Sequence, residues 1–149
     1  MSWNPKFPKK KRLNRSAEED TFWRWFSRYI RLRDTSDTGI CRCITCNTML
    51  HPMYMQCGHF IKRNRYSIKY NEENNNAQCP GCNSFENGNA GVYAIRLDQK
   101  YGAGTAEKLV NLASRKGKLK AFECKLLADE YREKAYAELK RTGLVAWWK

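Results

Sequence analysis

The chain has 149 residues, of which 28 are Lys or Arg and 15 are Asp or Glu, so its formal net charge is +13. This charge favours a polyanionic partner, with nucleic acid ahead of an anionic membrane surface. The sequence contains no apolar stretch of membrane-spanning length and no signal peptide, which argues against an integral membrane or secreted protein. The length is typical of one domain with an added arm or tail.

Residues 1–15 are rich in Lys and Arg and contain no acidic residue. Pro5 and Pro8 discourage regular secondary structure there. We predict a flexible basic arm that binds DNA phosphates, with a solubilising tail as the alternative. The cations assigned to DNA in this arm are Lys9, Lys10, Lys11 and Arg12.

The first predicted helix begins with a capping box, in which Ser16 is the N-cap and Glu19 the third helical residue. We expect this helix to end at about Arg33, before a turn-rich segment. Aromatic and aliphatic residues recur at helical spacing and form a core-facing stripe. The stripe consists of Phe22, Trp25, Phe26, Tyr29 and Ile30. The arginines on the rest of the helix are either solvated or follow phosphates, namely Arg24, Arg28, Arg31 and Arg33.

Residues 40–60 have the pattern of short strands. We predict a cysteine turn, a loop around His51 and Pro52, and a second strand from Met53 to Gln56. Residues 61–74 are polar and basic, which predicts a loop. Its cations Lys62, Arg63 and Arg65 are further DNA-binding candidates.

Four of the seven cysteines form two Cys-x-x-Cys pairs, Cys43 with Cys46 and Cys79 with Cys82. The odd number of cysteines and their spacing favour reduced thiols on a metal over a secreted disulfide scaffold. Two such pairs complete a tetrahedral four-thiolate zinc shell. Because this shell is closed, we predict that the zinc is structural. Cys41 and Cys57 lie nearby in the sequence and remain alternative ligands.

Chemistry is therefore expected from the residues that the zinc site would hold in place. A neutral His59 beside a divalent metal could take a proton from a water that attacks a phosphodiester. Asn83 offers an amide oxygen suited to Mg²⁺ or Mn²⁺, and Glu86, one turn further on, could bind the same ion. The amide of Asn74 could brace the loop that carries His59, whereas the two asparagines after it are predicted to be cap or turn residues.

Helices are predicted to dominate the C-terminal half. One should begin near Asn83 and be interrupted by Gly88 and Gly91, and residues 92–100 should again be helical. Thr105 is expected to cap a helix that reaches about Arg115. A last helix over residues 119–141 and the pair Trp147-Trp148 either pack against the same chain or form a subunit contact.

The central motifs carry a resemblance to a known class of enzyme. Gly58-His59, Asn74 and Cys79-x-x-Cys82-Asn83, framed by Cys43-x-x-Cys46, resemble an HNH endonuclease of the zinc-braced ββα-metal type. Further matching stretches resemble the lambdoid-phage NinG family, also called Rap, over roughly residues 20–135. These stretches are residues 29–34, 57–60, 71–72, 74, 78–79, 82–83, 88–89 and 93.

The resemblance implies endonuclease action on branched DNA, such as Holliday junctions and D-loops, in phage recombination. It implies His59 as the general base, Asn83 as a metal ligand, Asn74 as the middle asparagine and the four cysteines on zinc. Many HNH enzymes place a metal-binding aspartate just before the histidine, but this chain has Gly58. The second protein ligand of the catalytic ion is therefore open, with Glu86, Gln56, a backbone carbonyl or a contact from a shifted loop as candidates.

We accordingly expect an α+β, mostly helical protein with a treble-clef-like zinc core and flanking helices. Residues 1–15 should be the arm, 16–118 the nuclease domain with its core at about 40–90, and 119–149 a helix with a Trp-containing tail. We expect a homodimer that acts on DNA in the cytoplasm of a bacterial host, without a membrane partner. A general duplex-nicking HNH enzyme and a non-catalytic zinc-containing DNA-binding protein are the alternatives.

Overall fold

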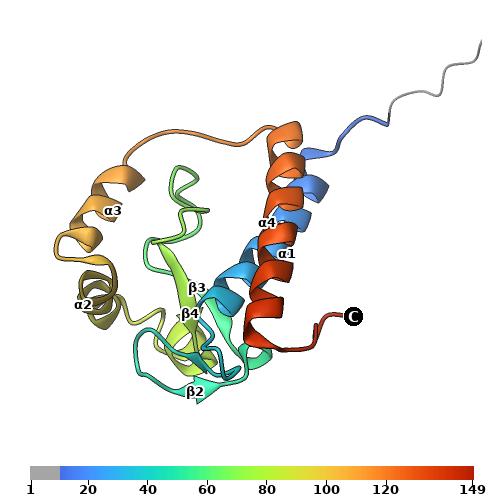
Figure 1. Cartoon of the computed structure of the whole chain (residues 1–149). Helices are drawn as coiled ribbons and strands as arrows, with labels where there is room; N and C mark the ends of the chain where they lie inside the picture. Colours follow the sequence, from blue (N-terminus) through green and yellow to red (C-terminus); the bar gives the residue numbers. More distant parts are fainter. Residues whose placement is uncertain (1–10) are drawn as a thin grey trace, which may run out of the picture.

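The computed structural model describes residues 11–149 and has a mixed helical and β architecture dominated by helices (Figure 1). Residues 1–10, and with them Lys9, Lys10 and most of the predicted arm, lie outside the described residues. The helices are α1 (Arg15–Arg33), α2 (Ala90–Tyr101), α3 (Thr105–Ala113) and α4 (Ala121–Thr142). The strands are β1 (Cys41–Arg42), β2 (Met49–Leu50), β3 (Gln56–His59) and β4 (Asn75–Gln78). Two short helical turns are η1 (Pro52–Tyr54) and η2 (Gly81–Phe85).

Helix α1 ends at Arg33 as predicted, but the prediction of its N-cap was wrong. The cap is Asn14, whose Oδ1 accepts a hydrogen bond from the Ala17 backbone N–H at 3.3 Å. Ser16 therefore lies inside the first turn. The Glu19 carboxylate does not reach back to a cap residue, because it binds the side chain of Lys69 at 2.7 Å.

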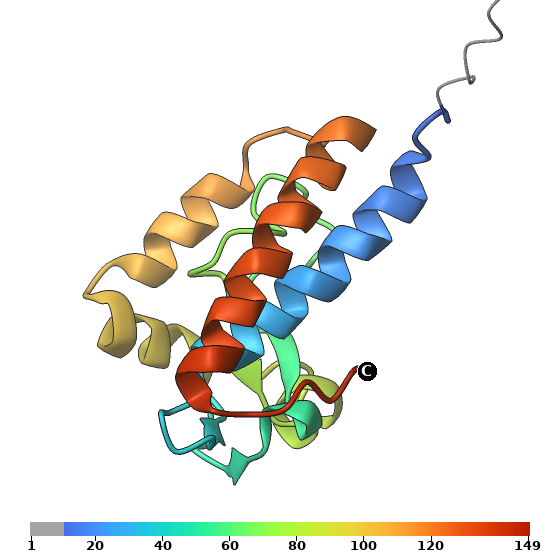
Figure 2. The ribbon, with the colours of Figure 1, turned by 45° about the vertical axis from the view of Figure 1, so that its right-hand side comes forward.

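Helices α1 and α4 lie side by side and run in the same direction (Figure 2). Phe22 and Phe26 of α1 pack on Tyr131 of α4, with 5.0 Å between the Phe26 and Tyr131 ring centroids. At the far end, Arg141 donates hydrogen bonds to the carbonyls of Leu32 and Thr35. The structure thus shows the first of the two alternatives for the last helix, which is packing against the first helix of the same chain.

The C-terminal tryptophans also pack on α1. The Trp148 and Trp25 ring centroids lie 5.9 Å apart, and the Arg31 guanidinium lies 5.3 Å from the Trp147 ring centroid. Stacking of a guanidinium on an indole is worth about 0.5–1 kcal/mol at exposed sites and more where water is excluded. The end of the chain therefore reinforces the α1–α4 pair.

Two antiparallel hairpins form the β structure. Strand β1 pairs with β2, and β3 pairs with β4 in a register that places His59 opposite Asn75. The predicted strand from Met53 to Gln56 was wrong: residues 52–54 form η1, and the strand begins at Gln56.

Strand β4 was not predicted, because consecutive asparagines have a low β propensity. Asn75 and Asn76 were expected in a turn or cap, but they are fully buried in β4. Their amides bind backbone carbonyls of the preceding loop, with Asn75 Nδ2 3.0 Å from the Lys69 carbonyl oxygen. Tertiary hydrogen bonds thus override the local preference of these residues.

The C-terminal end of α1 is tied to the β3–β4 hairpin by buried charges. Arg33 donates hydrogen bonds to the backbone carbonyls of Glu72 and Asn75. It also forms an ion pair with Asp34. The Asp34 carboxylate in turn accepts a hydrogen bond from the Ala77 N–H at 2.8 Å. Arg31 donates to the carbonyl of Met55. The expectation that the α1 arginines are solvated or bind phosphates was therefore wrong for Arg31 and Arg33, which hold backbone carbonyls.

Helices α2 and α3 form the other side of the molecule, and residues 114–120 connect α3 to α4 across the top (Figure 1). Helix α2 agrees closely with the prediction. The expected capping role of Thr105 was wrong, since Gly104 is the N-cap with φ +87° and Thr105 is the first helical residue. Its hydroxyl instead donates to the Gly102 carbonyl.

Candidate functional site

The sulfur atoms of Cys43, Cys46, Cys79 and Cys82 lie within 4.8 Å of one another. The first pair follows β1 and the second follows β4, so the two hairpins bring the pairs together. The turn after the first pair is closed by Asn47, which adopts a left-handed conformation with φ +63° and donates its N–H to the Cys43 carbonyl. These four cysteines can therefore hold one metal ion such as zinc, as the spacing predicts.

The surroundings of the four sulfurs suit bound thiolates. The Cys46 thiol donates to the Thr48 hydroxyl oxygen at 3.0 Å, and the Thr45 hydroxyl lies 3.1 Å from Cys43 Sγ. Although burial opposes ionisation, the hydrogen bonds with Thr48 and the neighbouring cysteines lower the pKa of the Cys46 thiol to about 6. Such outer hydrogen bonds orient metal ligands and stabilise their charged form.

The alternative ligands are not among the four converging sulfurs, although Cys41 packs in the same apolar cluster as Cys43. Cys41 is fully buried and its thiol donates to the Arg31 carbonyl at 3.5 Å. Cys57 packs in the α1–α4 core, where its thiol lies 3.6 Å from Asn75 Oδ1. Burial raises the pKa of both thiols to about 12, which is typical of inert structural cysteines.

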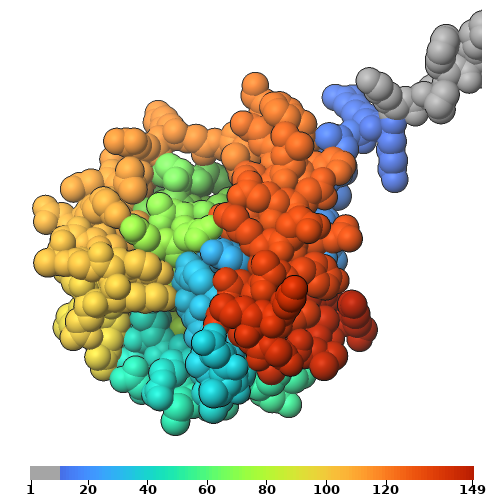
Figure 3. Space-filling view, viewed as in Figure 1, coloured from blue at the N-terminus to red at the C-terminus, as the bar shows by residue number. Residues whose placement is uncertain are grey.

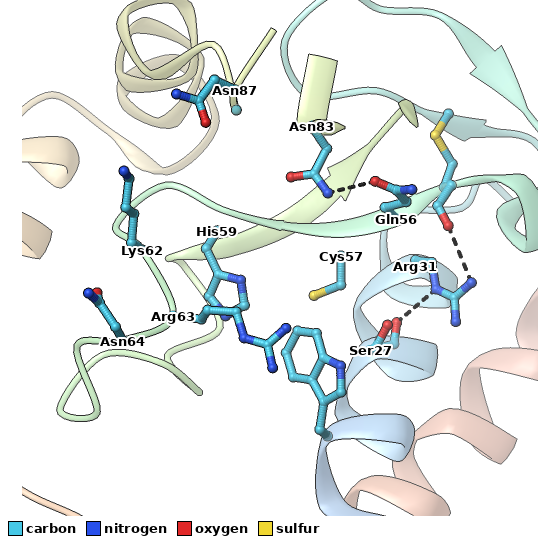
Figure 4. Close-up of a pocket in the computed structure, with 13 residues that line it drawn as sticks. Ser27, Arg31, Gln56, Cys57, His59, Lys62, Arg63, Asn64, Asn83 and Asn87 are labelled. Carbon is cyan, nitrogen blue, oxygen red and sulfur yellow. Dashed lines mark hydrogen bonds between the residues drawn. The ribbon is translucent and has the colours of Figure 1, made fainter. Parts of the chain in front are cut away.

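A cavity of about 700 Å³ lies between α1, β3, the loop after β3 and η2 (Figure 4). It brings together His59 and Asn83 of the predicted site with the predicted DNA-binding residues Lys62 and Arg63. It is lined by Trp23, Ser27, Arg31, Met55, Gln56, Cys57, His59, Lys62, Arg63, Asn64, Asn83, Asn87 and Gly88.

His59 ends β3 and is held in one orientation. Its Nε2 lies 3.0 Å from the Lys69 carbonyl oxygen, and its ring stacks on Trp23 with centroids 5.2 Å apart and an interplanar angle of 18°. A carbonyl oxygen can only accept a hydrogen bond, so Nε2 carries the proton and Nδ1 keeps a free lone pair. Burial, reinforced by the charges of Arg63 and Lys69, lowers the pKa of His59 to about 4. The imidazole is therefore neutral at physiological pH.

The carbonyl that fixes His59 is itself held from two sides. Asn75 Nδ2 donates to the same Lys69 oxygen at 3.0 Å, and the Lys69 side chain forms its ion pair with Glu19 of α1. Both Lys69 and Glu19 are largely buried at this ion pair. Helix α1 thus supports the imidazole both directly, through Trp23, and indirectly, through Glu19.

Asn74 braces the loop after His59 and does not line the cavity. Its Oδ1 accepts from the Ile61 N–H at 2.8 Å, and its Nδ2 donates to the carbonyls of Ile61 and Ile68. The side chain is fully buried. The geometry matches the bracing role expected for this asparagine and keeps it away from any substrate in the cavity.

Asn83 is oriented by a residue on β3. Its Nδ2 donates to Gln56 Oε1 at 2.7 Å, and the Ser84 hydroxyl donates to the same oxygen at 3.0 Å. Figure 4 shows the Asn83 amide oxygen pointing away from Gln56. Gln56 is therefore engaged in positioning Asn83, and the free oxygen of this pair is that of Asn83.

Glu86 is exposed and is not among the residues that line the cavity, so the structure does not bring it together with His59 and Asn83. Its neighbour Asn87, in a left-handed conformation with φ +51°, lines the cavity instead. Within the described residues no carboxylate lines this cavity. Amide oxygens alone suit a divalent ion only weakly, because Mg²⁺ usually binds through a carboxylate together with substrate phosphates.

The side chain of Gln78 leaves no space for a side chain at position 58, and the sequence did not predict this contact. A Cβ at this position would lie 2.0 Å from Gln78 Oε1 on the paired strand. Gln78 is fully buried, and its Nε2 donates to the Gly88 carbonyl at 3.0 Å. Its Oε1 has no hydrogen-bond partner in the described part of the chain. An aspartate in place of Gly58 would therefore collide with Gln78.

The remaining DNA-binding candidates within the described residues lie at the surface. Lys11 and Arg12, which precede α1, are exposed, and Arg65 is exposed on the loop after β3. None of the helices between residues 11 and 149 is both long and apolar enough to cross a membrane.

Comparison with known proteins identifies one family. The model of the family described as Bacteriophage Lambda NinG protein matches residues 4–141, which is most of the chain. Searches of curated proteins and of solved structures gave no match. Membership of this family implies a role related to phage recombination. On this match the chain belongs to the NinG family of bacteriophage proteins.

Proposed function

We propose that the protein is a metal-dependent endonuclease that hydrolyses phosphodiesters in branched recombination intermediates. The observation that carries this proposal is the neutral, oriented His59 with its free Nδ1 in a cavity that also contains Asn83 and the cations Lys62 and Arg63. A DNA-binding protein without catalysis does not require an imidazole whose tautomer and ring plane are both fixed.

In this proposal a DNA phosphate enters the cavity and is bound by Lys62 and Arg63. A water attacks the phosphorus while His59 Nδ1 takes its proton, and the bond from phosphorus to the leaving oxygen breaks. The Lys69 carbonyl accepts the Nε2–H throughout and stabilises the imidazolium that forms. Trp23 and Asn74 position the ring and the loop and do not touch the reacting atoms.

The proposed metals have different roles. Zinc held by the four cysteines would fix the turn that leads into Asn83 and would take no part in hydrolysis. A Mg²⁺ or Mn²⁺ ion would be held by the Asn83 amide oxygen, and when bound it would stabilise negative charge on the phosphate and the leaving oxygen. Because no carboxylate lines the described cavity, the DNA phosphate must supply further oxygens. We therefore expect this ion to bind far more tightly in the presence of DNA.

A labelled four-way junction and a linear duplex of the same sequence test this function. Each is incubated with the zinc-loaded protein and Mg²⁺, Mn²⁺ or no added divalent ion. We expect ion-dependent nicking that favours the junction. Equal nicking of both substrates would support a general duplex-nicking enzyme, and tight binding without cleavage under any condition would support a non-catalytic DNA-binding protein.

We further propose that the protein acts as a homodimer in the host bacterium, because resolving a two-fold symmetric junction requires two cuts and each chain has one His59. Trp147 and Trp148 are used within the chain, so the remaining apolar surface of α4 is at Phe122 and Leu126, which are 53% and 65% exposed. Light scattering with and without the junction tests this. We expect two chains per junction, reduced to one by Leu126→Glu but not by the control Lys125→Glu. A single chain per junction in the unmodified protein would contradict the dimer.

A further inference from the structure

A second concave surface adjoins the cavity. It has a volume of about 300 Å³ and lies between the loop after β3 and the segment that connects α3 to α4. We call it the connector groove. It is lined by Asn64, Arg65, Tyr66, Ser67, Ala113, Ser114, Arg115, Lys116 and Gly117. In the space-filling view, the loop after β3 (green) lies beneath the connecting segment (orange) (Figure 3).

Specific contacts hold the two walls of the groove together. The Ser67 hydroxyl donates to the Leu112 carbonyl at 3.2 Å, and the Lys118 ammonium lies 5.2 Å from the Tyr66 ring centroid. A cation over an exposed aromatic ring gains about 0.5–1 kcal/mol. These contacts join segments that are about fifty residues apart, so the groove is a feature of the fold.

The groove is strongly cationic. Arg65, Arg115 and Lys116 line it, Lys118 lies beside it over the Tyr66 ring, and all four are exposed. None of these four side chains forms an ion pair with an acidic residue of the described chain. Other cations, such as the exposed Lys125 and the half-buried Lys134, are paired with carboxylates. The cations of the groove are therefore available for an external anion.

The groove is continuous with the cavity that holds His59. Asn64 lines both, and it follows Lys62 and Arg63 of the cavity directly in sequence. Positive side chains thus extend from the proposed reaction site, along the loop after β3, to the connecting segment. A linear polyanion that places one phosphate in the cavity would meet further cations along this path.

We propose that the connector groove binds the DNA backbone on one side of the scissile phosphate. This inference rests on the proposed function, because it takes the cavity as the place of cleavage. Arg115, Lys116 and Lys118 neutralise phosphates of the flanking nucleotides. The groove therefore contributes affinity and register and no chemistry.

The test compares two variants that each lose one Arg and one Lys. Arg115→Gln/Lys116→Gln removes charge from the groove, and the control Arg132→Gln/Lys140→Gln removes the same charge from exposed positions on α4. Junction binding is measured at several salt concentrations without Mg²⁺ or Mn²⁺. Each phosphate contact contributes about −0.9 to the slope of log affinity against log salt, so the groove variant should reduce the steepness by about 2 and the control should not.

Cleavage supplies the second readout. The groove variant should raise KM while leaving kcat at saturating junction unchanged, because the groove does not touch the reacting atoms. If the groove variant and the control have the same slope and KM, the inference is overturned, although the unmodified protein still cuts DNA. Absence of cleavage by the unmodified protein would instead overturn the proposed function, and the salt slopes would still decide whether the groove binds DNA.

Discussion

The cysteine cluster and the cavity meet at the turn that follows β4, but they are built in different ways. The cluster consists of four identical ligands from two short sequence motifs, with sulfurs within 4.8 Å of one another. The cavity has a volume of about 700 Å³ and takes its residues from α1, β3, the loop after it and η2. The difference indicates that local spacing encodes the cysteine cluster, whereas long-range hydrogen bonds shape the cavity. Substitutions in the cysteine cluster and in the long-range contacts test this difference separately.

The largest effect is expected at the cluster. Cys79→Ser should abolish zinc binding and leave the chain largely unfolded, because binding of structural zinc is coupled to folding. The control is Cys41→Ser, which changes a buried thiol outside the cluster. Native mass spectrometry should show one zinc ion per chain for the control and none for Cys79→Ser, with circular dichroism to follow the fold. A folded, metal-free Cys79→Ser protein would show that the cluster is dispensable.

The next effect is expected at the ion pairs that join α1 to the hairpin. Asp34 is almost completely buried, and burial alone would raise its pKa, but Arg33, Lys100 and the Ala77 N–H together lower it. Asp34→Ala would leave Arg33 buried without its partner, which should lower the free energy of unfolding by about 3–5 kcal/mol. The control is Asp37→Ala, which removes an exposed carboxylate paired with Arg141. Similar denaturation midpoints for the two variants would contradict a structural role for Asp34.

A smaller effect is expected where the two strands meet. Gly58→Ala should lower the free energy of unfolding by about 1–3 kcal/mol, because the new methyl group would collide with Gln78 Oε1. Gly117→Ala is the matched control, since a Cβ there meets no atom within 4 Å. Combining Gly58→Ala with Gln78→Ala should cost less than the sum of the two single changes. Strict additivity in urea denaturation would show that Gln78 does not exclude a side chain at position 58.

The subtlest prediction concerns protonation of His59. Its pKa is lowered to about 4 in the folded protein, whereas an unfolded histidine titrates near pH 6.5. The unfolded state therefore binds more protons between these values, and stability contributed by neutral His59 is lost as the pH falls through this window. NMR titration of the His51→Gln variant, which retains one imidazole, should give a midpoint near 4 for His59. A midpoint near 6.5 would show that the ring is not desolvated as the structure indicates.

The elements that sequence could predict are those that depend on local periodicity. The turn-rich segment after Arg33 predicted the end of α1 correctly, and the two Cys-x-x-Cys pairs identified four sulfurs that converge. Capping was less predictable: Asn14 caps α1 although Ser16 begins a better capping motif. Alternative caps one or two residues apart differ little in energy, so tertiary contacts such as the Glu19–Lys69 ion pair decide between them.

The residues that hold the walls of the cavity in place could not be predicted, because their contacts are formed only in the folded chain. Gln78 is an unremarkable glutamine in the sequence, yet it requires glycine at position 58. Trp23 falls outside the stripe assigned to the core, and it stacks on His59 instead. One signal was available: Asn75, Asn76 and Gln78 form a polar run directly before Cys79 of the cysteine cluster. A buried strand with paired amides is an alternative to a turn at such a place.

The central claim is that His59 is the general base, and its most direct test separates cleavage from binding. His59→Ala and the control His51→Ala are compared on the four-way junction in the presence of Mg²⁺ or Mn²⁺. The account predicts a loss of about 10²–10⁴-fold in the cleavage rate for His59→Ala alone, with junction affinity and zinc content unchanged. Cleavage that survives in His59→Ala, or a loss of affinity as large as the loss of rate, would contradict it.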